Sequence, residues 1–240
     1  MWKKQLFLII ISIICLSIYG QGNRKKSFYK NYSDSIESVF KIRYQIPKGF
    51  DLVDTLITWS EEGVESIGGF GYRPVMQSHD KKCLLSYGFS PLYFPTTEGL
   101  FSDPNGAFFR EANLAHRNNF MLDMSYMLNT RDFNPKDYLL VQPQKNAKQW
   151  FNADSIFVFD ILPLKQPIVL NGTVYRRATK MFVSRRDRAY MQFVLFFNDE
   201  TDSKKMKYFS KLKKNIWYHD AEWTFDMRRW QNAIFDSKKS

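Results

Sequence analysis

The chain has 240 residues, of which 44% are apolar and 17% aromatic, and its formal net charge is +11 at pH 7. The apolar content excludes an intrinsically disordered protein, and the length suffices for one sizeable hydrophobic core. We therefore expect a basic protein with one folded domain.

Residues 1–20 have the layout of a secretory signal peptide. Met1–Lys4 is a short basic start, Leu6–Ile18 is an apolar run, and Tyr19-Gly20 places a small residue before Gln21. The run of about 13 residues is shorter than the roughly 20 that a membrane-spanning helix needs. We expect cleavage near Gln21 and export to the periplasm, the outer envelope or the medium, with no transmembrane segment after signal cleavage.

Two alternatives for this segment stay open. Lipid attachment at Cys15 would follow Ile13-Ile14, and branched residues fit that processing site poorly. An uncleaved anchor is the other alternative, because the basic residues 24–26 weaken the charge bias across the run. Signal cleavage would leave Cys83 as the single thiol, so no internal disulfide is expected. This cysteine usage is more typical of an exported bacterial protein than of a eukaryotic one.

The remaining chain is predicted to form a flexible leader (21–38), a single α+β domain (39–235) and a frayed tail (236–240). Alternating apolar and polar residues predict a strand from Phe40 to Ile46, closed by a turn at Pro47–Gly49. Asn171-Gly172 predicts a second turn. Further strands are predicted at 52–59, 83–89, 156–159, 174–183 and 189–197, the last two forming a hairpin with a charged tip.

Helices are predicted at 108–128, 135–140 and 146–151. The acidic stretch Asn198–Asp202 is typical of a helix start, and the helix after it has an apolar stripe of Met206, Phe209, Leu212 and Ile216. A last helix is predicted after Asp220, with Trp223, Met227, Trp230 and Ile234 on one face. Together the elements predict an α+β fold in which helices pack on an antiparallel sheet.

A cluster of basic residues gives one candidate binding surface. The lysine-rich helix 204–214 could contact anionic lipid or acidic polysaccharide, and the hairpin tip extends this surface if it lies nearby, although a solvated helix face explains the same lysines. Export makes nucleic acid an unlikely partner. The candidate ligand-binding residues are Lys204, Lys205, Lys207, Lys211, Lys214, Arg185 and Arg186.

The sequence contains no recognisable catalytic or metal motif. His79, His116 and His219 are isolated, without the paired spacing of metal ligands, and no serine lies in a GxSxG elbow. We therefore assign no catalytic residue, metal or cofactor. A hydrolase would need a site assembled only in three dimensions, in which His79 or His219 meets an acid and a nucleophile in one pocket.

Three Asp-Ser/Thr-aliphatic tripeptides match an O-glycosylation sequon of exported bacterial proteins, at Ser35, Thr55 and Ser155. Aromatic residues could also stack on sugar rings. Those in or near predicted loops are Trp59, Tyr72, Tyr93, Phe94 and Trp150.

Two resemblances follow from particular segments. Tyr19-Gly20-Gln21, Trp150–Ser155 and Lys204–Tyr218 resemble small uncharacterised exported proteins of Gram-negative anaerobes, which imply no site. The segment Tyr44–Phe50 is similar to the strand-Pro-x-Gly-aromatic start of PsbP-like α/β/α sandwiches. That resemblance implies a binding or assembly-support module.

We therefore expect a non-enzymatic accessory or binding protein of the cell envelope, whose partner is an envelope protein, a glycan or an anionic surface. The alternatives are a glycan- or anionic-surface-binding module that uses helix 204–214, and the hydrolase described above.

Overall fold

The computed structural model describes residues 33–34, 36–53, 75–90, 115–161, 164, 167–186, 188–198 and 204–222. The predicted signal peptide, the last predicted helix and the tail lie outside these residues, as do Ser35 and Thr55. Within them, no helix is long and apolar enough to cross a bilayer.

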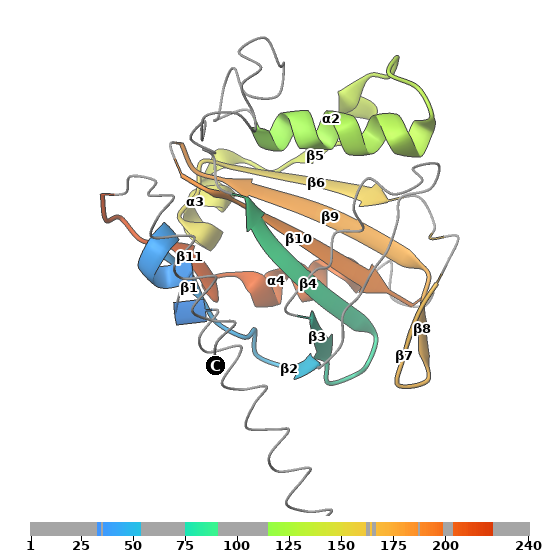
Figure 1. Ribbon diagram of the computed structural model, residues 1–240, viewed down its shortest axis with the longest axis horizontal. Coiled ribbons are helices and arrows are strands. Elements are labelled where there is room, and N and C mark those ends of the chain that lie inside the picture. The colour runs from blue at the N-terminus through green and yellow to red at the C-terminus, as the bar shows by residue number, and fades with distance from the viewer. Residues whose placement is uncertain are drawn as a thin grey trace, which may run out of the picture.

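Seven strands form one antiparallel sheet in the order β2-β3-β4-β10-β9-β6-β5, and two further strand pairs, β1–β11 and β7–β8, lie outside it. Figure 1 shows the sheet between the helices. The prediction of an α+β fold with helices on an antiparallel sheet is therefore confirmed. The strands are β1 (Ile42–Tyr44), β2 (Phe50–Val53), β3 (Val75–Ser78), β4 (Cys83–Ser90), β5 (Leu140–Val141), β6 (Ser155–Ile161), β7 (Ile168–Leu170), β8 (Thr173–Tyr175), β9 (Arg177–Ser184), β10 (Tyr190–Phe197) and β11 (Ile216–Tyr218).

Helices cover both faces of the sheet. On one face, α2 (Ala115–Leu128) packs Phe120 and Met124 against β6 and β9, and we call this the α2 face. On the other, α3 (Gln144–Phe151) and α4 (Lys205–Leu212) pack beside the β1–β11 pair, and we call this the α4 face. The central strand β10 is buried along almost its whole length because both faces are covered, so its sequence is apolar without alternation.

The structure corrects the predicted start of the domain. Residues 36–40 are helical, so Phe40 does not belong to the strand predicted from Phe40 to Ile46. Lys41 has a positive φ of 55°, which separates this helical turn from β1. Ile36 is buried, so the packed part of the chain begins before residue 39, within the predicted leader.

The apolar stripe predicted for α4 is also wrong in two positions. Met206 is 50% exposed, and Ile216 lies in β11 because the helix ends at Leu212. The residues that α4 buries are Tyr208, Phe209 and Leu212.

Three local predictions differ from the structure in informative ways. The helix predicted at 135–140 is a single 3-10 turn, Pro135–Asp137, and Leu140 belongs to the edge strand β5. Strand β3 was not predicted. The turn at Asn171-Gly172 is confirmed, with φ values of 49° and 76°, and it joins β7 to β8.

Candidate functional site

A buried arginine organises one end of the sheet, where the β1–β11 pair crosses the β9–β10 hairpin. The Arg188 guanidinium donates to the carbonyls of Phe40 (2.6 Å), Lys41 (3.0 Å) and His219 (3.1 Å). The Tyr218 hydroxyl lies 2.8 Å from the Ala189 carbonyl. These contacts hold the end of the helical turn 36–40 against the end of β11, because guanidinium can donate up to five hydrogen bonds.

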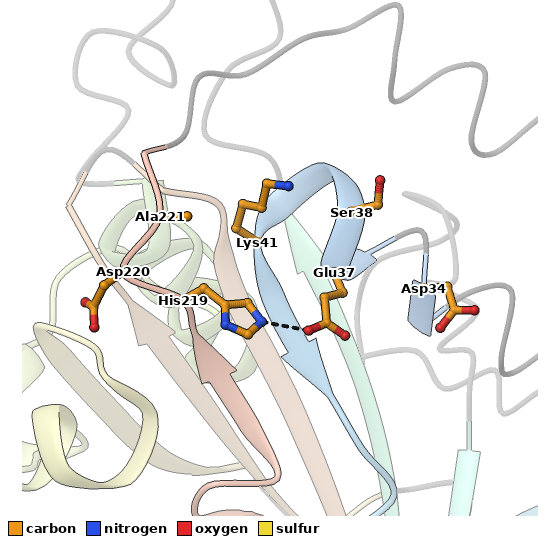
Figure 2. Close-up of a pocket in the computed structure, with 7 residues that line it drawn as sticks. All are labelled: Asp34, Glu37, Ser38, Lys41, His219, Asp220 and Ala221. Carbon is orange, nitrogen blue, oxygen red and sulfur yellow. Dashed lines mark hydrogen bonds and ion pairs between the residues drawn. The ribbon is translucent and has the colours of Figure 1, made fainter.

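An open polar cavity of about 630 Å³ lies at this junction. Figure 2 shows that the helical turn 36–40 supplies one wall and the segment after β11 supplies the other. His219 Nε2 lies 2.7 Å from Glu37 Oε1 across the cavity, and both side chains remain partly exposed. The lining residues are Asp34, Glu37, Ser38, Lys41, His219, Asp220 and Ala221.

Asp220 is fixed by residues behind the cavity. Asn152 ends α3 with a φ of 55°, and its Nδ2 donates to Asp220 Oδ1 (2.9 Å) and to the Tyr218 carbonyl (2.7 Å). Arg185 Nη2 lies 2.9 Å from the same carboxylate oxygen. Hydrogen bonds from Asn152 and Arg185 hold the pKa of Asp220 below its usual range, so this carboxylate is ionised and oriented.

The three histidines lie in different parts of the molecule. His79 is exposed and lies 3.4 Å from Asp51. His116 is buried on the α2 face, where its Nε2 lies 3.4 Å from Ser184 Oγ. Burial, together with the nearby charge of Arg117, lowers the pKa of His116 to about 4, so it is neutral at pH 7.

His219 alone approaches the arrangement that the hydrolase hypothesis requires. It meets a carboxylate in a cavity, but Figure 2 shows the Ser38 hydroxyl pointing away from the imidazole. Cys83 is buried in β4, and burial raises the pKa of its thiol, which disfavours the thiolate. Among the described residues, no group of three or more His, Cys, Asp or Glu side chains could hold a metal ion.

The structure places the five predicted lysines along or next to α4, and the two predicted arginines between β9 and β10. Lys205 pairs with Asp160 (2.5 Å) and Lys207 with Asp80 (3.3 Å), while Lys211 Nζ lies 5.5 Å from the Phe50 ring centroid. Lys204 and Lys214 are exposed. Three of these five lysines therefore contact the sheet or the turn between β3 and β4.

The two arginines lie at the opposite end of the sheet from Lys205. Asp160 is opposite Thr179 in the β6–β9 register, whereas Ser155 is opposite Ser184, next to Arg185. Five residues of strand separate these positions by roughly 17 Å. Arg185 binds Asp220 and also donates to the Asn152 carbonyl (3.4 Å), and the Lys214 amide donates to the Trp150 carbonyl (2.9 Å). Arg185 is therefore far from Lys205, but it contacts the same end of α3 as Lys214 does. The Arg186 amide donates to Asp154 (2.7 Å).

Two other predicted sites are engaged in the fold. Ser155 Oγ lies 2.6 Å from Ser184 Oγ within the β6–β9 pair, so glycosylation there would require loss of this contact. The ring of Trp150 is covered by Lys213, whose ammonium is 3.7 Å from the ring centroid. A sugar cannot stack on that face of the indole while Lys213 occupies it.

Sequence reasoning missed most of the cavity. Glu37 and His219 are 182 residues apart, and no spacing rule connects them. Asn152 carried a usable signal, because asparagine tolerates positive φ at the end of a helix better than most residues do. No sequence pattern pointed to Lys41 or Arg188.

Comparisons with protein families and with curated proteins find no match to this chain. Among solved structures, the chain is similar to cyanobacterial PsbP (CyanoP) from Synechocystis sp. PCC 6803. The similarity has 12% identity and a TM-score of 0.32, and it covers 74% of this chain and 86% of that protein. PsbP-like sandwiches are also what the segment Tyr44–Phe50 resembles, but a TM-score this low assigns neither family nor function.

Proposed function

We propose that this protein is an exported, non-enzymatic accessory protein of the cell envelope. It binds a polar partner in the open cavity between Glu37 and His219, which we call the His219 cavity. The cavity is the observation that supports this proposal. Its scaffold, Arg188 and Tyr218, is buried and donates to backbone carbonyls, whereas the side chains of Glu37, Lys41 and His219 face an open space. Rigid support behind exposed charged groups is typical of a binding site.

The charges in the cavity favour a ligand that carries both amino and carboxylate groups. Asp34 and Glu37 can accept hydrogen bonds from an ammonium group, and Lys41 can pair with a carboxylate. The lining residues that the structure describes include no Trp, Tyr or Phe, so these residues give no support for stacking on a neutral sugar. Peptide chain ends and peptide-bearing envelope polymers have the required chemistry.

Titration with defined probes tests this binding role. We expect tri-alanine and a disaccharide–tetrapeptide muropeptide to shift the backbone amide resonances of residues 37–41 and 219–221. Lys41→Gln and Glu37→Gln should each weaken binding about tenfold, since each removes one charge-assisted contact. The matched controls Lys204→Gln and Asp137→Asn alter exposed charges outside the cavity and should leave binding unchanged. The absence of any shift at millimolar probe concentrations would contradict the proposal.

Export has its own test, which is independent of the ligand. The intact mass of the protein recovered from its native host should correspond to a chain that begins close to Gln21. A chain that retains residues 1–20 would instead support the uncleaved-anchor alternative.

A further inference from the structure

A shallow apolar groove lies on the α4 face beside the edge strand β5. Leu140, Val158 and Met181 are neighbours across β5, β6 and β9 in the strand register, so their side chains share this face. Trp150 of α3 and Phe209 of α4 also line the groove. The groove is therefore the part of the α4 face that α3 and α4 leave incompletely covered.

Two side chains of this groove project into solvent. Leu140 is 56% exposed, and Met206, at the start of α4, is 50% exposed. The hollow itself measures only about 10 Å³, which is too small to receive a bulky group from a partner. Neighbouring exposed apolar side chains mark an interaction surface. On this surface Leu140 and Met206 would insert into the partner, because the hollow is too small for the partner to insert into it.

The surroundings of Leu140 and Met206 are strongly basic. The segment 135–151 contains three lysines and a single aspartate, Asp137, and the segment 204–214 contains six lysines and no acidic residue. Lys207 and Lys211 contact Asp80 and Phe50 towards the other edge of the sheet, so only Lys204, Lys205, Lys213 and Lys214 are counted with the groove. Lys205 is paired with Asp160, and Lys213 lies over Trp150, so both are held beside the groove. The occupant that complements this surface must be both anionic and apolar.

We propose that this surface, defined by Leu140 and Met206 with the lysines of 135–151 and with Lys204, Lys205, Lys213 and Lys214, docks on a bilayer of anionic phospholipid. The two apolar side chains enter the acyl boundary while the lysines face the headgroups. An acidic protein partner would need an apolar pocket of its own for these two side chains, whereas the acyl boundary of a bilayer accepts both without one. The proposal is independent of the His219 cavity, which lies at the β1–β11 end of the fold.

Vesicle flotation with the full chain tests the docking surface. We expect co-flotation with phosphatidylglycerol vesicles at low salt, weaker binding to phosphatidylcholine vesicles, and loss of the difference at high salt. The double variant Leu140→Ser/Met206→Ser should lower the partition coefficient on phosphatidylglycerol by roughly 25-fold, since each half-exposed apolar side chain contributes about fivefold. Val169→Ser is the matched control, because Val169 is 66% exposed on β7, far from β5 in Figure 1.

Residues 1–20 are common to all variants, so the comparison between variants isolates the surface. Equal binding to both lipids, or equal flotation of the double variant and the wild type, would overturn the proposal. Stronger retention on poly-L-glutamate than on phosphatidylglycerol would indicate an acidic protein partner instead. A dimer that the double variant disrupts would indicate a second copy of the chain. Circular dichroism should show that all variants keep the wild-type fold, because the replaced side chains are exposed.

Discussion

The two faces of the central sheet attach their helices with the same residue pair in different environments. On the α2 face, Lys180 of β9 pairs with Asp123 of α2, and the two side chains are only 5% and 16% exposed. On the α4 face, Lys205 pairs with Asp160 of β6, with exposures of 26% and 57%. Burial therefore differs several-fold while the chemistry of the pair stays the same.

This difference separates structural charges from charges that remain available for binding. A buried ion must keep its partner, because an uncompensated charge in the interior costs several kcal/mol. An exposed pair is screened by water, and α4 is attached mainly by the buried side chains of Tyr208, Phe209 and Leu212. We infer that the Lys180–Asp123 pair of the α2 face keeps its partners, whereas the exposed lysines of the α4 face can exchange theirs.

The largest effect is expected from breaking the buried pair. Asp123→Leu leaves the Lys180 ammonium without its carboxylate, which should lower the free energy of unfolding by about 3–5 kcal/mol. Urea denaturation monitored by fluorescence measures this loss. The double variant Asp123→Leu/Lys180→Met removes both charges and should recover most of the stability. If the single and double variants were equally unstable, packing rather than the unpaired charge would explain the loss.

A smaller loss of stability, also on the α2 face, is expected at low pH. His116 has a folded-state pKa of about 4, below its ordinary value of 6.5, so the unfolded chain takes up a proton first. The stability that depends on neutral His116 is complete above pH 6.5 and is lost as the pH falls towards 4, with a limit of roughly 3 kcal/mol. Urea denaturation midpoints measured at pH 7.5, 6 and 5 should therefore fall as the pH falls.

His116→Gln provides the control for this pH dependence, because glutamine does not titrate. The difference between wild type and variant cancels the contributions of the other groups. Parallel pH profiles for the two proteins would contradict a buried neutral imidazole.

Much of the fold follows from local sequence patterns. The hairpin of β9 and β10 was predicted because its apolar runs flank a charged tip, and α3 was predicted within two residues of its observed start. The sequence-based predictions fail where one continuous apolar pattern runs across a boundary between a helix and a strand. Phe40 continues the alternation of β1 but lies in a helical turn, and Ile216 continues the spacing of α4 but lies in β11.

The candidate site was much less predictable, because its residues come from distant segments. The sequence identifies His219 as an isolated histidine and as one candidate for a hydrolase site assembled in three dimensions, but its partner Glu37 lies within the predicted flexible leader. The exposed Met206 was missed for a different reason. Helical spacing identified it as a core position, and only the packing of Tyr208 against the sheet turns that face of α4 away.

The smallest effect should come from the exposed pair, and it completes the comparison with Lys180. Lys205→Met should change the free energy of unfolding by about 0.5 kcal/mol or less, and the difference should vanish at 1 M salt. Asp160 also accepts a hydrogen bond from Thr179 Oγ1 (2.6 Å), so it keeps a partner in the variant. Lys180→Met, the same replacement on the α2 face, leaves Asp123 unpaired and should cost several kcal/mol. Equal losses of unfolding free energy in the two variants would mean that burial does not decide what these ion pairs contribute to stability. The lysines of α4 would then be held by their partners as firmly as Lys180 is, and would not be available to an anionic surface.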